Sequence, residues 1–209
     1  MVKTFLFDFD GVLVDSAQIR ADGYLDVLLP EYEAFEGEIR RYVEVHGGVS
    51  RFDKFRYIYE HILREELSKE RFTQLCEAYA ATVRDRVACA PEIPGVAVFL
   101  RKLPSDCTAC IVSGSPEIEL RGLVAVRPWG SVFAEVLGSP TPKTPQLAAL
   151  IKRRGIAPES AVFFGDSITD ADAAIACQIE FVGIGKPWAN APGIWYPDFN
   201  AIEPVSFGL

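Results

Sequence analysis

The hydrophobic positions of this chain follow two different patterns. A short apolar run at residues 2–7 (VKTFLF) stops at acidic residues and a glycine, as a buried parallel strand does. Residues 16–88 instead carry their apolar positions at helical spacing, among most of the Arg, Glu and Tyr of the chain. This stretch predicts amphipathic helices near residues 17–29, 32–45, 51–66 and 69–88, punctuated by Pro30 and by Gly47-Gly48.

From Pro91 onward, helical and strand patterns alternate. Helices are expected at residues 94–103, 116–126, 145–154 and 168–178, and strands at 106–113, 133–137, 161–165 and 180–184. Alternation of this kind is typical of a parallel sheet with helices on both faces. We therefore predict an α/β fold with a doubly wound, Rossmann-like core made of residues 1–15 and 89–209, and a helical domain of residues 16–88 inserted after the first strand. The tail, residues 186–209, is rich in Pro and aromatics and receives no assignment.

Composition adds limits to this picture. The chain has 209 residues, of which 49% are hydrophobic and 24% charged, as in ordinary soluble globular proteins. The net charge of −8 gives no support to binding of nucleic acid or of an anionic membrane surface. The apolar N-terminus is interrupted by charge after seven residues, which favours neither a signal peptide nor a membrane span. A cytoplasmic protein is the default expectation, and we expect its five cysteines, including the CxxC pair Cys107 and Cys110, to be reduced core residues.

Four polar segments each follow a predicted strand. They are residues 8–16 (DFDGVLVDS), 113–115 (SGS), 140–143 (PTPK) and 165–172 (GDSITDAD). In a parallel α/β sheet, ligands bind at the carboxyl ends of the strands, so these segments should converge there. Together they offer carboxylates for a metal ion, hydroxyl and amide donors for phosphate, and one lysine, which is the inventory for phosphoryl transfer.

The acidic residues of these segments predict a metal site. Asp166 and Asp170 are four residues apart at a predicted helix start and should share a face. Repulsion between them and Asp8 would be costly unless a cation lay among them, and an all-oxygen ligand set favours Mg²⁺ over zinc. Helix capping by acidic residues is the alternative interpretation of this pair.

In order and spacing, the four segments resemble the four motifs of the haloacid-dehalogenase superfamily. The resemblance covers nearly the whole chain and points to the branch that contains phosphoglycolate phosphatase and β-phosphoglucomutase. It implies that Asp8 is the nucleophile, which forms an aspartyl-phosphate, and that Asp10 is the general acid/base. The dehalogenases of the superfamily lack an aspartate at this position, and the transport ATPases have a threonine there. Asp10 therefore groups this chain with the phosphatases and mutases.

The same resemblance implies the roles of the remaining core residues. Asp8, the carbonyl of Asp10 and Asp166 would hold Mg²⁺ directly, with Asp170 supporting them from behind. Lys143 would stabilise negative charge on the nucleophile and the phosphate, and is counted with Asp8 and Asp10 as catalytic. The expected phosphate-binding residues are Phe9, Asp10, Ser113, Gly114 and Lys143. Ser115 is also a candidate N-cap of the helix that follows.

The helical insertion begins where one branch of the superfamily carries a cap that closes over the site and contacts the substrate. Within it, residues 48–51 (GVSR) resemble a segment of β-phosphoglucomutase whose arginine binds the remote phosphate of the substrate. Arg51, with His46 and Lys54, is therefore the candidate specificity set. The alternative is that Ser50 caps a helix while Arg51 and Lys54 are solvated. Arg20 is a further candidate at the mouth of the site, at a position where the mutases have a histidine.

Three functions follow in order of preference. The first is a phosphatase, a phosphoric monoester hydrolase acting on a small phosphorylated metabolite such as a sugar phosphate or a phosphoglycolate-like acid. The second is a sugar phosphomutase of the β-phosphoglucomutase type, which Arg20 argues against. The third is a non-catalytic binding protein, which would be favoured by loss of the nucleophile or metal ligands, all of which are present here.

Overall fold

The sheet of this protein is parallel throughout. The computed structural model describes residues 2–203 and contains six strands in the order β3-β2-β1-β4-β5-β6. Their bounds are β1 Thr4–Phe7, β2 Thr108–Pro116, β3 Phe133–Ser139, β4 Ala161–Gly165, β5 Glu180–Ile184 and β6 Ile194–Tyr196. Because β1 lies between β2 and β4, with which it pairs in parallel, the chain direction across the sheet reverses at β1. This is the position where open α/β sheets bind their ligands, and the predicted fold class is confirmed.

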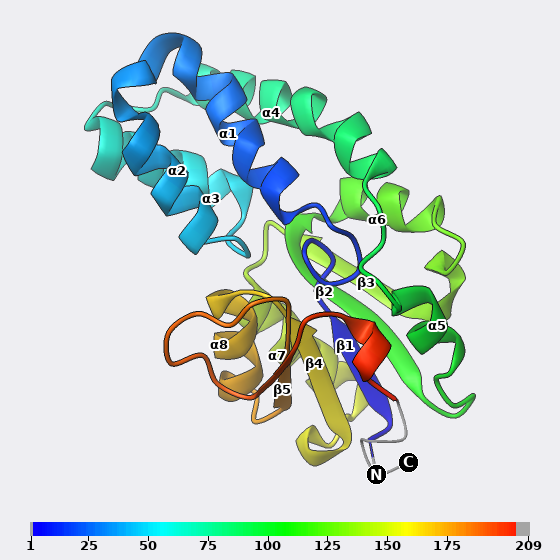
Figure 1. The fold of residues 1–209 in the computed structure, drawn as a ribbon. Helices are drawn as coiled ribbons and strands as arrows, with labels where there is room; N and C mark the ends of the chain where they lie inside the picture. The colour runs from blue at the N-terminus through cyan, green and yellow to red at the C-terminus, as the bar shows by residue number, and fades with distance from the viewer. Residues whose placement is uncertain (1, 204–209) are drawn as a thin grey trace.

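Helices cover both faces of the sheet (Figure 1). On one face lie α5 (Val96–Arg101) and α6 (Glu117–Ala125), and on the other α7 (Lys143–Arg154) and α8 (Ile168–Ala176). The β1 strand shows why two layers form, since consecutive side chains of a strand point to opposite faces. Phe5 and Phe7 belong to the apolar cluster on the α5 side, and Leu6 to the cluster under α7 and α8, each fully buried.

The tail, which received no assignment from the sequence, adds a strand to the sheet and an aromatic ring to the apolar cluster on the α5 side. Its strand β6 extends the sheet beside β5, and a 3-10 turn at Phe199–Ala201 follows. The ring of Phe199 packs against those of Phe7, Phe99 and Phe164. Residues 204–209, the rest of the tail, lie outside the described residues.

The insertion is helical, as predicted. It consists of α1 (Ala17–Tyr32), α2 (Glu36–Val45), α3 (Arg51–Tyr57) and α4 (Lys69–Cys89), with a 3-10 turn at Glu33–Phe35 and a π-helical segment at Ile58–Leu63. These helices pack on one another and stand together at one end of the molecule, above the carboxyl ends of the strands (Figure 1). The arrangement is what the division into a core and an inserted cap would produce, and that division stays a prediction.

Two helix ends in the insertion differ from the expected ones. Pro30 is expected to mark the end of the first helix, but α1 continues through it to Tyr32. A proline inside a helix leaves the carbonyl four residues earlier unpaired, and both Pro30 and Asp26 are exposed, so water can reach that carbonyl. The third helix ends earlier than residue 66, because Arg64 adopts a left-handed conformation with a φ of 57°.

Two backbone segments join the insertion to the sheet, and they lie side by side. The amide of Asp15 donates to the carbonyl of Pro91 at 2.9 Å, and the amide of Ile93 donates to the carbonyl of Leu13 at 3.1 Å. Val14 and Glu92 form an antiparallel bridge between them. We call residues 13–15 and 91–93 the linker pair.

Among residues 2–203, no helix combines the length and the apolar character needed to cross a membrane.

Candidate active site

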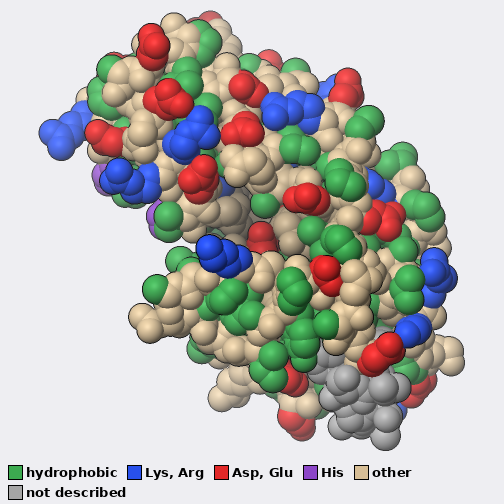
Figure 2. Space-filling view, in the orientation of Figure 1, with side chains coloured by type: hydrophobic (Ala, Val, Ile, Leu, Met, Phe, Trp, Pro, Cys, Tyr) green, Lys and Arg blue, Asp and Glu red, His purple; other side chains and the backbone are tan. Residues whose placement is uncertain are grey.

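The four polar segments meet at the carboxyl edge of the sheet, as predicted, beneath the helical insertion. A cavity of about 370 Å³ lies between the two layers, and Figure 2 shows the surface hollowed there. Its walls from the sheet side include Asp8, Asp10, Ser113, Gly114 and Asp166. Its walls from the insertion include Arg20, Arg51 and Lys54. A cavity of this size suits a small metabolite.

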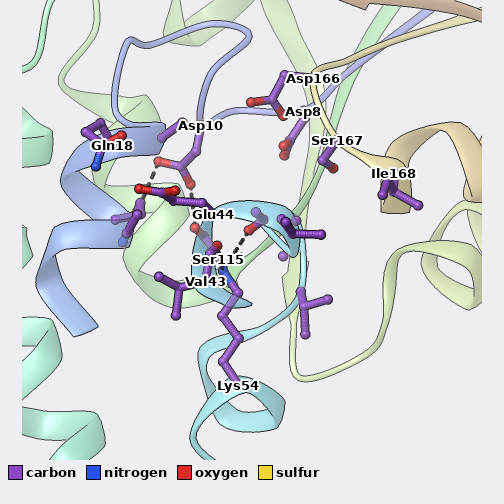
Figure 3. Close-up of a pocket in the computed structure, with 18 of the residues that line it drawn as sticks. Asp8, Asp10, Gln18, Val43, Glu44, Lys54, Ser115, Asp166, Ser167 and Ile168 are labelled. Carbon is purple, nitrogen blue, oxygen red and sulfur yellow. Dashed lines mark hydrogen bonds and ion pairs between the residues drawn. The ribbon is translucent and has the colours of Figure 1, made fainter. Parts of the chain in front are cut away.

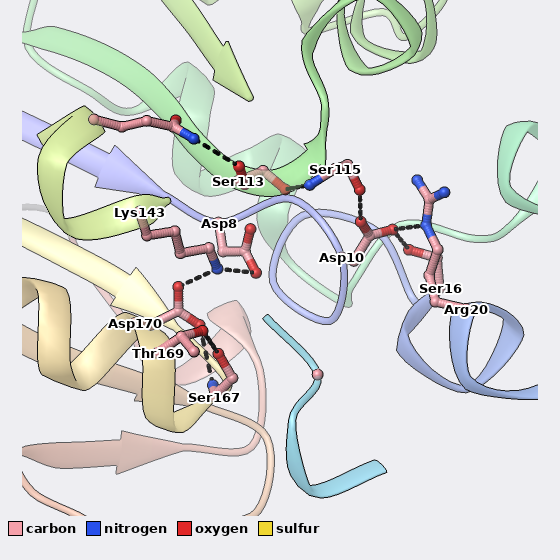
Figure 4. Close-up of polar contacts among 12 residues, drawn as sticks. Asp8, Asp10, Ser16, Arg20, Ser113, Ser115, Lys143, Ser167, Thr169 and Asp170 are labelled. Atoms are coloured by element: carbon pink, nitrogen blue, oxygen red, sulfur yellow. Dashed lines mark hydrogen bonds and ion pairs between the residues drawn. The ribbon is translucent and has the colours of Figure 1, made fainter. Parts of the chain in front are cut away.

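Asp8 lies at the centre of the site because it directly follows β1. Its side chain is buried, and Oδ2 lies 2.9 Å from Nζ of Lys143. The same amine also contacts Oδ1 of Asp170, so Lys143 joins two carboxylates (Figure 4). The other oxygen of Asp8, Oδ1, is buried and accepts no hydrogen bond from residues 2–203. One oxygen of the predicted nucleophile is therefore held in place while the other remains free to react or to bind a cation.

Asp166 comes close to the loop after β1 because a glycine makes room for it. Gly11 has a φ of +81°, and a Cβ at this position would lie 2.0 Å from Oδ2 of Asp166. Carboxylate oxygens of Asp8, Asp166 and Asp170 lie within 4.8 Å of one another. Any side chain at position 11 would therefore displace one member of this acidic cluster.

The acidic cluster is electrostatically costly as it stands. Burial raises the pKa of Asp8 to about 7, and the carboxylates of Asp170 and Asp10 add to this while Lys143 opposes it. Burial, followed by Asp170 and Asp8, raises the pKa of Asp166 well above its ordinary value. Burial alone would lower the pKa of Lys143, but Asp170 and Asp8 raise it above its ordinary value, so the amine stays charged. The three carboxylates thus lie beside a single positive charge, that of Lys143, so negative charge exceeds positive charge in the cluster.

These residues fit a magnesium ion. The donors are hard carboxylate oxygens, which Mg²⁺ prefers over the nitrogen and sulfur ligands typical of zinc. Asp8 has a buried oxygen without a partner among residues 2–203, and Asp166 faces it across the loop of Gly11. A divalent cation here would supply the missing positive charge.

Asp170 is positioned differently from Asp8 and Asp166, since both of its oxygens already have donors. Oδ2 accepts hydrogen bonds from the amide of Ser167 at 3.1 Å and from its hydroxyl at 2.5 Å, and Oδ1 contacts Lys143. Ser167 and Asp170 form a capping box at the start of α8. The capping interpretation and a supporting role behind the metal ligands are thus compatible. Asp166 precedes α8, so the two aspartates do not share a helical face as the spacing suggested.

Asp10 is held by three donors on the opposite side of the site. Its Oδ1 accepts from the hydroxyl of Ser16 at 2.6 Å and from Nε of Arg20 at 3.0 Å, and its Oδ2 accepts from the hydroxyl of Ser115 at 2.7 Å (Figure 4). Burial on its own would raise the pKa of Asp10, but the charge of Arg20 and these hydrogen bonds lower it below its ordinary value. The predicted general acid/base is therefore oriented by residues from the insertion as well as from the sheet.

The serine segment, residues 113–115, lies within β2 and not after it, and one residue of it was assigned wrongly from the sequence. Ser115 does not cap a helix, because β2 continues to Pro116 and α6 begins at Glu117. The hydroxyl of Ser115 binds Asp10 instead, and its amide donates to the hydroxyl of Ser113 at 3.2 Å. Ser113 is buried, and it lines the cavity with Gly114, as a phosphate-binding role requires. Phe9 has a fully buried side chain in the core, so its backbone is the part available to a phosphate.

The insertion touches the sheet side through two glycines. A Cβ on Gly48 would lie 1.9 Å from Oγ1 of Thr169 and 3.1 Å from Nζ of Lys143. A Cβ on Gly114 would lie 2.3 Å from the carbonyl oxygen of Gly48. The loop at Gly48 therefore rests directly on Lys143 and on the start of α8, which the lack of side chains at these two positions permits.

Arg51 lines the cavity, but its guanidinium is already paired. Nη1 donates to Oε2 of Glu119 at 3.0 Å, and Nη2 contacts the other carboxylate oxygen. Glu119 belongs to α6, so this bidentate pair connects the insertion to the sheet side. The predicted substrate contact of Arg51 would have to compete with a carboxylate of the protein itself.

The Arg51–Glu119 pair should hold the two layers together. Arg51→Met and Glu119→Gln should each lower the free energy of unfolding, and the double variant should lose less than the sum. The difference, a coupling of about 1 kcal/mol, is expected for an ion pair with one buried partner, and urea unfolding measures it. Arg56→Met is the control, because exposed Arg56 pairs with Asp53 within its own helix. Additive losses in the double variant would mean that the pair contributes nothing across the layers.

Lys54 and His46, two other candidates from the insertion, differ in whether they line the cavity. The side chain of Lys54 is buried and lines the cavity. His46 is not among the residues lining the cavity, and its ring packs beside Tyr42 with centroids 4.7 Å apart. Ser50 caps α3 by accepting from the amide of Asp53 at 3.2 Å, as the alternative interpretation proposed. The idea that Arg51 and Lys54 are solvated is wrong, since both are buried.

Comparison with known proteins assigns the family. The sequence profile of the haloacid dehalogenase-like hydrolases matches residues 2–178, which is most of the chain. The chain belongs to this family. Among its relatives in the family is the phosphoglycolate phosphatase of Pseudomonas putida, 26% identical over 227 residues that cover 97% of this chain and 79% of the relative. Phosphoglycolate phosphatase 1 of Pseudomonas aeruginosa is 27% identical over 217 residues, and this alignment covers 98% of this chain and 79% of the relative.

Solved structures show the same fold at low identity. CbbY from Rhodobacter sphaeroides, crystallised with phosphate, has a TM-score of 0.77 at 14% identity, with both chains covered in full. A putative beta-phosphoglucomutase from Bacteroides vulgatus has a TM-score of 0.72 at 20% identity, covering 94% of this chain and 84% of the other. The predicted enzyme class, a phosphoric monoester hydrolase of the haloacid dehalogenase-like family, is confirmed by the family match together with the phosphatase relatives.

Several residues of this haloacid dehalogenase-like site were not among the sequence candidates for it. Ser16 and Ser115 bind Asp10, Ser167 binds Asp170, and Glu119 binds Arg51. Ser16, Ser115 and Ser167 lie within the polar segments identified from the sequence, so their position was a usable signal. Glu119 gave no such signal, because its partner is 68 residues away along the chain.

Proposed function

We propose that this protein is a magnesium-dependent phosphatase that hydrolyses a small phosphorylated metabolite through an aspartyl-phosphate on Asp8. The observation that carries the proposal is the environment of Asp8. One of its oxygens is held by Lys143, the other is buried without a partner among residues 2–203, and Asp166 and Asp10 line the same cavity. The phosphatase relatives support the same chemistry.

The residues divide the reaction into two steps. In the first, a carboxylate oxygen of Asp8 attacks phosphorus and the bond from phosphorus to the leaving oxygen breaks. Asp10 supplies a proton to that oxygen, and because its lowered pKa favours the carboxylate form, it must take up this proton as the phosphate ester binds. In the second, Asp10 takes a proton from water, which attacks the aspartyl-phosphate, releases inorganic phosphate and restores Asp8. Ser16, Arg20 and Ser115 hold the carboxyl group of Asp10 in one orientation for both transfers.

The charges of the site suit this chemistry. Lys143 stays protonated and would face the anionic phosphoryl group beside Asp8. Asp8, Asp166 and the backbone carbonyl of Asp10 would hold magnesium, with Asp170 behind them, and the ion would neutralise charge on the phosphoryl oxygens. Ser113 and Gly114 would bind a phosphoryl oxygen from the end of β2.

A phosphomutase is the second candidate, since it would use the same nucleophile and has a structural neighbour in the putative beta-phosphoglucomutase. The position of Arg20 favours hydrolysis. Where the mutases have a histidine, this chain has an arginine whose Nε binds Asp10, and a guanidinium with a pKa above about 12 cannot shuttle a proton near neutral pH.

We expect free phosphate rather than isomerised sugar. Purified protein would be given β-glucose 1-phosphate with a bisphosphate activator and magnesium, while glucose 6-phosphate and phosphate are followed together. Phosphate should be released without need for the activator, and phosphoglycolate assayed in parallel should also release phosphate. Rapid isomerisation with little free phosphate would favour the mutase, and no turnover of any phosphate monoester would favour a binding protein.

A further inference from the structure

Lys54 is a buried cation on the insertion side of the cavity. It lies in α3, its side chain is 3% exposed, and it lines the cavity together with Asp8 and Asp10. Figure 3 shows the side chain running from its helix toward the part of the cavity where Ser115 and Asp10 lie. Its charge acts on the catalytic centre, because Asp10 and Asp166 are among the groups that influence its pKa.

The hydrogen bonds of Lys54 leave one of its N–H donors unused. Its Nζ donates to the carbonyl oxygens of Val43 at 3.3 Å and Gly47 at 3.2 Å, and lies 5.1 Å from the centre of the Tyr24 ring. An ammonium group has three N–H donors, so one remains beyond these two hydrogen bonds. Within residues 2–203, no carboxylate lies at ion-pair distance from it. Burial lowers the pKa of Lys54 to about 7, and the more distant charges of Asp10 and Asp166 oppose this shift only in part.

The other cations around the cavity are already matched or solvated. Arg20 pairs with Asp10, Lys143 with Asp8 and Asp170, and Arg51 with Glu119. Lys186 lines the cavity from the sheet side but is exposed to water. Among the described residues that line the cavity, Lys54 is thus the buried cation that forms no direct ion pair with a carboxylate of residues 2–203.

A buried charge without a counter-charge is costly, and a bound anion would remove the cost. We propose that Lys54 binds a carboxylate of the substrate, at the end remote from the phosphoryl group, and selects short phosphorylated acids. This rests on the proposed function and names its substrate class. A carboxylate fits better than a second phosphate because Lys54 has one spare donor, and because the cavity of about 370 Å³ must also admit the phosphoryl group.

The competing explanation is that Lys54 only ties the end of α2 to the loop at Gly47. That role would affect every substrate alike, because the loop rests on Lys143 and on the start of α8. Recognition of a carboxylate would instead affect only substrates that carry one. The difference between matched substrates therefore separates the two roles.

The test compares kcat/KM for phosphoglycolate with that for hydroxyethyl phosphate, which has an alcohol in place of the carboxylate. The wild type should prefer phosphoglycolate, and Lys54→Gln should lower its kcat/KM for phosphoglycolate by about 10- to 100-fold, mainly through KM. Glutamine keeps a donor for the two carbonyls, so activity on hydroxyethyl phosphate should change less than about 3-fold. Lys186→Gln, which removes an exposed cation of the same cavity, should leave the preference unchanged.

Three results would overturn the proposal: equal losses on both substrates, no loss on either, or the same loss with Lys186→Gln. Ethylene glycol bisphosphate is assayed alongside, and a preference for it over phosphoglycolate would contradict the assignment to a carboxylate. If the wild type releases phosphate from none of these esters, the proposed function fails. Calorimetric binding of phosphoglycolate in magnesium buffer, with Lys54 intact or replaced by glutamine, then decides the role of Lys54 without turnover. Weaker binding to the variant supports it, and equal binding overturns it.

Discussion

Asp8→Asn should abolish phosphate release while leaving the protein folded. Asparagine has nearly the shape of aspartate, but its amide cannot attack phosphorus or leave again as an acyl phosphate. The loss in kcat should reach about 10⁴-fold or more, as when nucleophiles of other hydrolases are removed. Release of inorganic phosphate from phosphoglycolate under saturating magnesium measures it, with thermal unfolding as the check on the fold.

The folded state of this variant should not suffer. Lys143 keeps Asp170 as a partner, and one of the crowded carboxylates loses its charge. The matched control is Asp15→Asn, which changes an exposed carboxylate of the same polar segment and should keep wild-type activity. Near-normal turnover by Asp8→Asn would show that another residue accepts the phosphoryl group.

Removal of divalent cations should have the second large effect. Excess chelator should reduce phosphate release to background, and magnesium should restore it. Calcium should restore it poorly, because its larger and less regular coordination would misplace the reacting oxygens. Independently of turnover, magnesium at about 100 times its Kd should raise the free energy of unfolding by about 2.7 kcal/mol, because it binds the folded acidic cluster.

Two aspartate variants make this test specific to the proposed ligands. Asp166→Asn should lose both the magnesium-dependent activity and the magnesium-dependent stabilisation. Asp172→Asn alters an exposed residue of α8 outside the cluster and should keep both. Full activity in excess chelator, or equal stabilisation of the Asp166→Asn variant, would end the assignment of magnesium to this cluster.

The sheet and the position of the candidate catalytic residues on it were predictable from the sequence for a physical reason. Strands of a parallel sheet are short, buried and followed by polar loops, so segments such as residues 161–165 stand out, and β4 has these bounds. The residues after them must meet at one edge of the sheet, whatever their separation along the chain. The order of strands and polar loops is therefore enough to place Asp8, Ser113 and Asp166 together.

The insertion was less predictable because its contacts are set by packing between layers. His46, Arg51 and Lys54 are close along the chain, yet His46 packs outside the cavity and Arg51 pairs with Glu119. Lys54 lines the cavity and has no carboxylate of residues 2–203 at ion-pair distance. A helical pattern indicates which face is apolar, but it does not reveal which residue of another layer will face it. The ends of α1 and α3 were missed for a related reason, since exposure of Pro30 and the backbone turn at Arg64 are properties of the folded chain.

The linker pair constrains how the insertion can move. Two neighbouring segments held together by backbone hydrogen bonds must bend together, so any swing of the helices would turn about an axis through both segments and not freely, as it could on a single segment. Ser16 and Arg20 lie just beyond the linker pair, and both bind Asp10. A swing that opens the cavity would therefore also withdraw these donors, so that Asp10 would be fully oriented only with the cavity shut. Access for substrate and readiness for proton transfer would then alternate through a single mechanical motion.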